Sequence, residues 1–312
     1  MKKIKQKLNH IAIVSASLLW SIDGILRRSL YALPPAVVVM WEHILGIFVL
    51  LPLVLKRKSE LKNMTKKEWI AISLVGLFSG ALGTIFYTAA LGKVQYIQFS
   101  VVVLLQQLQP IWAISTAALL LKERLSKRFI FFAAIAIIGS YFVTFKDLKV
   151  NMTPGNETLI AALLALSAGV VWAVSTSLSK IVLKKISFIL ATFLRFVMAA
   201  IFALIFIIGF GQTTSITQVS VDQWQALLVI VFSSGLVALL IYYYGLRQVH
   251  ARTSAILELT WPISAVFIDL FYYKSAMTVT QLIAIVVVLF SMYQIANTKH
   301  SAERFMDELD KA

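Results

Sequence analysis

The chain has 312 residues, of which 60% are hydrophobic and 14% charged, and it contains no cysteine. A soluble domain carries roughly 25% charged residues, so this composition excludes a soluble globular protein and indicates an integral membrane protein. The lack of cysteine excludes disulfide and thiolate chemistry. The formal net charge of +15 lies mostly in short loops beside apolar runs, where basic residues set membrane orientation rather than bind nucleic acid.

Ten apolar runs are long enough, at roughly 20 residues each, to span a membrane as helices. They cover residues 10–30, 35–55, 68–91, 97–121, 128–145, 158–182, 188–209, 223–246, 253–273 and 278–297. With the N-terminus inside, 22 Lys and Arg residues lie on the inner side and six, including Arg27 and Arg28, on the outer side. This asymmetry predicts an all-α integral membrane protein with ten transmembrane helices and both termini cytoplasmic.

An internal repeat links the two halves of the chain. Trp20 and Trp172 lie 152 residues apart, and so do Pro110 and Pro262. Helices one to five therefore repeat as helices six to ten, and because five is odd, the second copy enters the membrane upside down. The predicted organisation is a basic N-terminus at 1–9, two five-helix inverted-topology repeats at 10–147 and 158–297, and a charged cytoplasmic tail at 298–312.

Each repeat contains an apolar helix that is broken by a proline. Gln106 precedes Pro110 by four residues, and Glu258 precedes Pro262 by four. Proline clashes with the carbonyl group four residues earlier and frees it from the helix. A freed carbonyl beside a polar side chain is tolerated in a membrane only within protein or against a wet cavity. We therefore predict Pro110 and Pro262 as hinges beside a central transport site; a static kink packed by neighbouring helices is the alternative.

Ionisable residues elsewhere in the spans mark further candidates, because a charge at the membrane centre costs at least about 2.5 kcal/mol. Asp23 either pairs with Arg27 four residues later, near the outer surface, or lies in the cavity. Glu42 and His43 are adjacent, about 100° apart on a helix. His43 either titrates near neutral pH or is a neutral histidine hydrogen-bonded between helices.

Arg195 is predicted to be the lone buried arginine. It either binds a carboxylate of the solute or pairs with Glu42 or Glu258. The predicted substrate-binding residues are Trp20, Asp23, Glu42, His43, Tyr87, Gln106, Gln107, Trp172, Arg195, Tyr242, Glu258 and Trp261. No metal site is expected.

Several segments resemble the EamA-type members of the drug/metabolite transporter superfamily. They are LLWSIDGIL, VVWAVSTSL, FLRFVMA, FYTAALGKV and YYYGLRQV, together with the two proline-broken helices. The resemblance covers nearly the whole chain. It implies a secondary transporter of small metabolites, often amino acids and often exported, with a central cavity walled by helices one to four and six to nine.

The predicted function is export of an amino acid or amine-bearing solute across a bacterial cytoplasmic membrane by alternating access, with protons as a candidate coupling ion through Glu42 or His43. No enzyme motif is present, and no cofactor is expected. The expected partners are a small-molecule solute and membrane lipid, without nucleic acid. Two alternatives stay open, namely a flippase for a lipid or lipid-linked intermediate and a non-transporting membrane scaffold or sensor.

Overall fold

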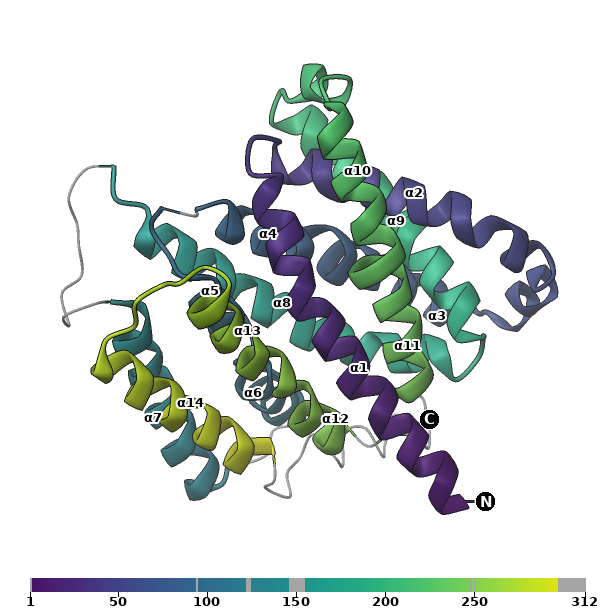
Figure 1. Cartoon of the computed structure of the whole chain (residues 1–312). Coiled ribbons are helices and arrows are strands. Elements are labelled where there is room, and N and C mark those ends of the chain that lie inside the picture. The colour runs from purple at the N-terminus through teal and green to yellow at the C-terminus, as the bar shows by residue number, and fades with distance from the viewer. Residues whose placement is uncertain are drawn as a thin grey trace.

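A computed structural model describes residues 2–93, 95–121, 125–145, 155–246, 249 and 251–296. Every regular element within these ranges is a helix (Figure 1). Nine of the described helices are long and apolar enough to cross a membrane. Large side chains such as Phe48, Ile138, Phe267 and Phe271 are exposed on their outer faces. Such apolar surface is suited to lipid, so the all-helical membrane fold predicted from composition is confirmed.

The helices of the first repeat are α1 (Lys2–Ser29), α2 (Pro35–Leu55), η1 (Lys58–Asn63), α3 (Lys66–Val75), η2 (Gly76–Gly83), α4 (Thr84–Gly92), α5 (Phe99–Gln106), α6 (Gln109–Leu121) and α7 (Lys127–Thr144). Those of the second are α8 (Thr158–Leu183), α9 (Phe188–Gly209), η4 (Thr213–Ile216), α10 (Val221–Ile230), η5 (Val231–Gly235), α11 (Leu236–Leu246), α12 (Ala251–Glu258), α13 (Thr260–Phe271) and α14 (Val279–Ala296).

Equivalent helices of the two repeats begin with the same local signal. Thr65 caps α3 through a capping box with Glu68, and Ser220 caps α10 through a capping box with Gln223. Thr65 and Ser220 lie 155 residues apart. In a capping box two free backbone N–H groups at a helix start are satisfied by side chains. The repeat therefore extends to the residues that start each helix.

One π-helical turn interrupts the third span of each repeat. The turn η2 joins α3 to α4, and η5 joins α10 to α11. Gly80 in η2 and Gly235 in η5 occupy equivalent positions, 155 residues apart. A π-turn widens the helix and changes which backbone carbonyl groups are free to accept other donors, and such turns are frequent at functional sites.

The predicted run at 97–121 is two helices rather than one. The chain turns at Gln107 and Leu108 between α5 and α6, and neither helix alone is long enough to span a membrane. A matching break at Leu259 separates α12 from α13. The predicted count of ten single spans is therefore not reproduced within the described residues, because the first broken helix divides into two short pieces three residues before its proline.

Equivalent helices of the two repeats run in opposite directions. Arg28, near the end of α1, donates to the carbonyl group of Ile97 at 2.6 Å, while Thr158, at the start of α8, donates to the carbonyl group of Tyr96 at 2.9 Å. The last turn of α1 and the first turn of α8 thus lie at the same end of the bundle. We call this the Arg27 end, and the opposite end, where α8 finishes beyond Ser179, the Ser179 end.

The pairing of helices follows the repeat. Helix α2 packs against α9, and α7 packs against α14, which lie side by side at one edge of the molecule (Figure 1). Helices α1 and α8 each pack on elements of the opposite repeat: α1 contacts α11 and α13, while α8 contacts α4 and α5. This arrangement places α1, α4, α8, α11 and the broken helices around one interior space.

Candidate functional site

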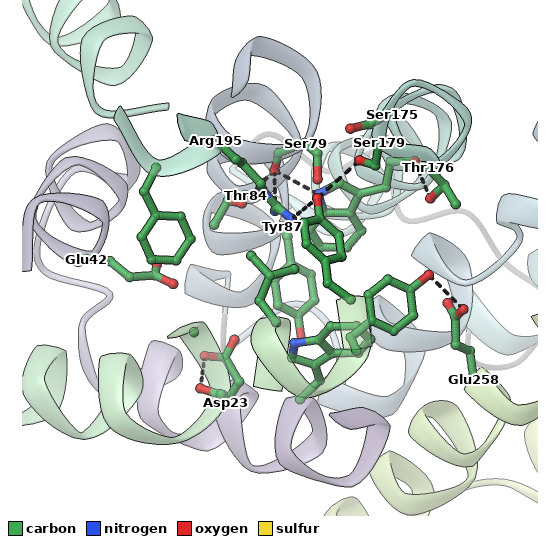
Figure 2. A pocket seen from close by; sticks show the side chains of 18 of the residues that line it. Asp23, Glu42, Ser79, Thr84, Tyr87, Ser175, Thr176, Ser179, Arg195 and Glu258 are labelled. Carbon is green, nitrogen blue, oxygen red and sulfur yellow. Dashed lines mark hydrogen bonds between the residues drawn. The ribbon is translucent and has the colours of Figure 1, made fainter. Parts of the chain in front are cut away.

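A pocket of about 860 Å³, part of which is open to solvent, lies between the two repeats. Its walls come from both repeats, as Figure 2 shows for a subset of the side chains. The lining residues are Trp20, Asp23, Arg27, Glu42, His43, Ser79, Thr84, Tyr87, Gln109, Trp172, Ser175, Thr176, Ser179, Arg195, Phe196, Ser234, Gly235, Leu239, Tyr242, Tyr243, Leu246, Glu258 and Trp261.

Five aromatic rings form a continuous cluster in this pocket. The ring of Trp261 lies 5.3 Å from Trp20, 5.7 Å from Tyr87 and 6.2 Å from Trp172, measured between centroids. Tyr242 lies 5.0 Å from Trp20, and Tyr87 lies 5.4 Å from Trp172. All five contacts are tilted or edge-on rather than stacked. The cluster offers ring faces and edges from five different helices to a bound molecule.

The aromatic cluster is built mostly from equivalent positions. Trp20 and Trp172 are repeat partners at an offset of 152, and Tyr87 and Tyr242 are partners at 155. Trp261 alone breaks the symmetry, since its partner in the first repeat is Gln109, which also lines the pocket. The two repeats therefore contribute nearly the same aromatic wall from opposite sides.

An ionic cluster lies at the Arg27 end of the pocket. The guanidinium group of Arg27 contacts the carboxylate of Asp23 at 2.5 Å and that of Glu42 at 2.8 Å, and it donates to the Thr88 hydroxyl group at 3.2 Å. All three charged side chains are 4–6% exposed. Ser234 of η5 donates to the second oxygen of Asp23 at 2.6 Å. Two carboxylates thus share one guanidinium group in a largely dry environment.

The first π-turn presents a backbone carbonyl group to the pocket. The oxygen of Ser79 in η2 accepts hydrogen bonds from the indole N–H of Trp172 at 3.1 Å, from the Thr84 hydroxyl group at 3.0 Å and from Arg195 at 3.4 Å. Figure 2 shows these donors converging on Ser79. The π-turn of the first repeat is therefore held by side chains of α8 and α9 in the second repeat.

The second π-turn makes the reciprocal contact. Ser234 of η5 holds Asp23 of α1, and Gly235 lies so close to Glu42 of α2 that a Cβ atom there would be 2.8 Å from its Oε1. Each π-turn thus touches the first two helices of the opposite repeat.

Equivalent positions also meet at the Ser179 end. Ser179 and Tyr243 hydrogen-bond through their hydroxyl groups at 3.1 Å, and they are the repeat partners of Arg27 and Thr88. Arg195 donates to the same Tyr243 hydroxyl group at 3.4 Å. Equivalent positions are in contact at both ends, but Ser179 and Tyr243 meet through hydroxyl groups, whereas Arg27 also binds two carboxylates.

The structure brings ten of the predicted site residues together in the pocket. They are Trp20, Asp23, Glu42, His43, Tyr87, Trp172, Arg195, Tyr242, Glu258 and Trp261. Gln106 and Gln107 do not line it. They are buried and hydrogen-bond to each other at 3.2 Å, and Gln106 also accepts from Gln109, which does line the pocket. Pro110 and Pro262 lie three residues beyond the two helix breaks.

The geometry bears on the alternatives for Asp23 and Arg195. Asp23 pairs with Arg27, but the pair is buried and faces the pocket, so the local pair and the cavity position occur together. Arg195 forms no ion pair with a described carboxylate; Glu42 is bound to Arg27 instead, and the Arg195 Nε atom has no hydrogen-bond partner among the described residues.

The prediction that Arg195 is the lone buried arginine is wrong. Arg27 and Arg28, assigned from loop charge to the outer side, are 4% and 9% exposed, whereas Arg195 is only half-buried. Arg28 donates to the carbonyl group of Ile97 and lies over the rings of Phe99 and Tyr273. A count of the charges in loops could not find these partners, because they lie far from Arg28 in the sequence.

Sequence reasoning also missed Arg27, Ser79, Ser175, Ser179 and Ser234 as lining residues. A signal existed for four of them. Ser175 and Ser179 follow from Asp23 and Arg27 by the offset of 152, and Ser79 and Ser234 are related by 155. His43 is 2% exposed; its Nδ1 atom lies 2.7 Å from the carbonyl oxygen of Val39, and its ring contacts Phe196 edge-on at 4.7 Å.

Comparison with known proteins agrees with this architecture. The family model described as the EamA-like transporter family matches residues 7–145 and 159–296, one match for each repeat. A protein of Fusobacterium nucleatum named riboflavin transporter ImpX is 33% identical over 299 residues, which cover 92% of this chain and 98% of that protein. One crystal structure aligns with a TM-score of 0.63 at 17% identity over 92% of this chain and 95% of its own, a similarity of fold. The chain belongs to the EamA-like transporter family and is a multi-pass membrane transporter rather than an enzyme.

Proposed function

We propose that this protein is a secondary transporter of riboflavin or of a closely related planar heteroaromatic compound. The five-ring cluster of Trp20, Tyr87, Trp172, Tyr242 and Trp261 is the observation that supports this proposal. Flat aromatic molecules bind between tilted rings through face and edge contacts, each worth about 0.5–1.5 kcal/mol beyond buried area. The relative named as a riboflavin transporter aligns over nearly its full length, which supports the same class of solute.

The charges in the pocket also favour a neutral solute. Asp23 and Glu42 are the two carboxylates that would attract an amine at the Arg27 end, and both are already bound to Arg27. Freeing either one would leave a buried charge without its partner, which costs several kcal/mol. A riboflavin ring instead needs hydrogen-bond partners for its carbonyl and imide groups. The half-buried Arg195 guanidinium group and the hydroxyl groups of Ser175, Thr176 and Tyr243 line the same pocket.

An amino acid or amine-bearing solute is the second candidate. Glu258 and Arg195 line the pocket, and neither forms an ion pair among the described residues. A zwitterion could place its ammonium group on Glu258 and its carboxylate on Arg195. Export is the predicted direction of transport. Efflux and uptake must therefore be measured separately.

We further propose that the protein works by alternating access, with Arg27 and Ser179 at its two gates. Arg27 joins α1 to α4 through Thr88, and Ser179 joins α8 to α11 through Tyr243, at equivalent positions of opposite ends. In the predicted orientation the Arg27 end faces outward. Inverted repeats interconvert two such states by exchanging their conformations. The breaks before Pro110 and Pro262 are the proposed hinges.

Counterflow in proteoliposomes tests the proposal. Purified protein is reconstituted with unlabelled riboflavin inside, and uptake of labelled riboflavin is followed; parallel vesicles receive labelled amino acids and amines. Efflux from preloaded vesicles is measured in the same preparation. We expect saturable exchange of riboflavin. Exchange of amino acids alone would establish the second candidate, and lipid scrambling without exchange of any solute would establish a flippase.

Two tryptophan variants test whether riboflavin binds in the pocket. Trp20→Ala removes two ring contacts and should weaken riboflavin binding by about tenfold. Trp69→Ala is the matched control, since Trp69 lies outside the pocket and is 38% exposed. Equal effects of the two substitutions would contradict the assignment of the aromatic cluster as the binding site.

A further inference from the structure

Glu258 differs from the other two acidic residues of the pocket because it forms no ion pair with a described residue. The described residues form four ion pairs; Asp23 and Glu42 share Arg27, and Glu258 takes part in none of the four. Figure 2 shows Glu258 across the pocket from Glu42 and Asp23. Its Oε1 atom accepts hydrogen bonds from Ser254 at 2.6 Å and from Tyr242 at 3.0 Å. The side-chain amide of Gln107 also interacts with this carboxylate.

The position of Glu258 makes a permanent negative charge costly. It lies within an apolar span and is the last residue of α12, where the partial charge of the helix is negative. A carboxylate at such depth costs at least about 2.5 kcal/mol. The other polar groups that face it are the amide of Gln107 and, from α8, the ammonium group of Lys180. A ligand that neutralises Glu258 would remove most of this cost.

A proton fits this site better than a metal ion. Both hydroxyl groups converge on one oxygen of Glu258, whereas a metal ion needs several oxygens arranged around an empty point. The described part of the chain contains no group of three or more His, Cys, Asp or Glu side chains that could hold a metal ion. A proton requires one carboxylate oxygen, and neither of the two hydroxyl groups binds Oε2.

The residues first predicted to carry a proton are engaged elsewhere. Glu42 is bound to Arg27 at 2.8 Å, and the Nδ1 atom of His43 lies 2.7 Å from the carbonyl oxygen of Val39. Glu258, in contrast, is connected directly to the aromatic cluster. Tyr242 contacts Glu258 through its hydroxyl group and Trp20 through its ring. A solute in the cluster and a proton on Glu258 would therefore share one tyrosine.

We propose that Glu258 binds the proton that drives transport, and that proton and solute move in the same direction. This inference rests on the proposed function of the pocket. A protonated carboxyl group donates a hydrogen bond, whereas a carboxylate only accepts. Riboflavin presents carbonyl oxygens and ring nitrogens, so it binds the protonated form through an O–H donor. The proton and the solute leave together when the pocket opens to the other side.

Riboflavin accumulation under a pH gradient tests this coupling. Proteoliposomes receive labelled riboflavin with the outside one pH unit more acidic, while potassium and valinomycin hold the membrane potential at zero. One pH unit corresponds to about 1.4 kcal/mol, so one proton per solute supports about a tenfold ratio of inside to outside riboflavin. A trapped pH-sensitive dye reports proton entry in the same vesicles. Exchange without a gradient is measured first, because it tests the proposed function independently.

The variant Glu258→Gln removes the titratable group but keeps an N–H donor. We expect its accumulation ratio to fall to one and its riboflavin binding to lose its dependence on pH, whatever exchange rate remains. Glu157→Gln is the matched control, because Glu157 pairs with Lys93 outside the pocket; it should keep the tenfold ratio. If Glu258→Gln is inactive, Glu258→Asp, which retains an acid, must still accumulate riboflavin.

Each remaining outcome is decisive. Wild-type exchange of riboflavin with a ratio of one would overturn the proton site and leave the proposed function intact. Accumulation by Glu258→Gln, failure of Glu258→Asp to accumulate while it still exchanges, or accumulation driven by a sodium gradient would also overturn the site. Absence of riboflavin exchange by the wild-type protein would overturn the proposed function, and the coupling inference with it.

Discussion

The two ends of the pocket are closed by contacts between equivalent positions but differ in chemistry. Arg27 meets Thr88 at one end, and their repeat partners Ser179 and Tyr243 meet at the other, with donor–acceptor distances of 3.2 and 3.1 Å. The Arg27 end adds two carboxylates, whereas the Ser179 end adds one guanidinium group, that of Arg195. Equivalent helices of the two repeats thus touch at equivalent positions, while the chemical groups that make the contact differ. The ionic end should be the harder one to open.

Removal of the shared cation should have the largest effect. Arg27→Met leaves Asp23 and Glu42 buried without a partner, which costs about 3–5 kcal/mol. We expect a large fall in the Tm of the purified protein in detergent. The triple variant Asp23→Asn, Arg27→Met, Glu42→Gln removes all three charges and should recover most of the loss. A triple variant less stable than Arg27→Met would show that the charges are not the cause.

Weakening the ionic cluster at the Arg27 end should increase the fraction of molecules whose pocket is open to the outside. The chain has no cysteine, so Thr176→Cys places a single thiol in the pocket. Adding Glu42→Gln replaces the charge-assisted hydrogen bond from Arg27, of a kind worth about 1.5–3 kcal/mol, by one to a neutral amide oxygen, and should raise labelling by a membrane-impermeant reagent from outside by about tenfold. The matched change at the other end, Tyr243→Phe, should not raise it. Equal labelling in both backgrounds would contradict the proposed gates or the predicted orientation.

A substitution at the contact between α8 and the first broken helix should have a smaller effect on stability. A Cβ atom at Gly169 would overlap the carbonyl oxygen of Gln106, a backbone atom that cannot rotate away. Gly169→Ala should therefore destabilise the protein by about 1–3 kcal/mol, measured as a fall in Tm. Gly209→Ala is the control, since no atom lies within 4 Å of a Cβ atom there. Equal Tm values for the two variants would show that α8 does not need this close approach.

The smallest effect is expected at the Ser179 end. Ser179→Ala removes one hydroxyl hydrogen bond to Tyr243 and should cost about 0.5–1.5 kcal/mol. The comparison with Arg27→Met in one Tm series measures the asymmetry between the ends directly. If Ser179→Ala destabilises the protein as much as Arg27→Met does, the two ends are energetically equivalent and the ionic cluster has no special role.

Much of the site could be predicted because the chain repeats. Trp20 and Trp172 share one repeat offset, Tyr87 and Tyr242 share the other, and all four predicted residues line the pocket. Gln106 and Gln107 are predicted to bind the solute because they precede a proline, yet they do not line the pocket. The proline predicted that the helix breaks, but not which face of the broken turn meets the cavity, since that depends on how the neighbouring helices press against it.

Composition, hydropathy and the offsets of 152 and 155 residues by themselves determined a helical membrane protein made of two related halves. These are local or periodic signals, and the bilayer allows few responses to them. Only the tertiary structure decided that Arg27 neutralises two carboxylates, that the Ser79 carbonyl group receives three donors, and that Glu258 forms no ion pair with a described residue. Such pairings join helices far apart in sequence, and burial makes their energy depend on which groups finally meet.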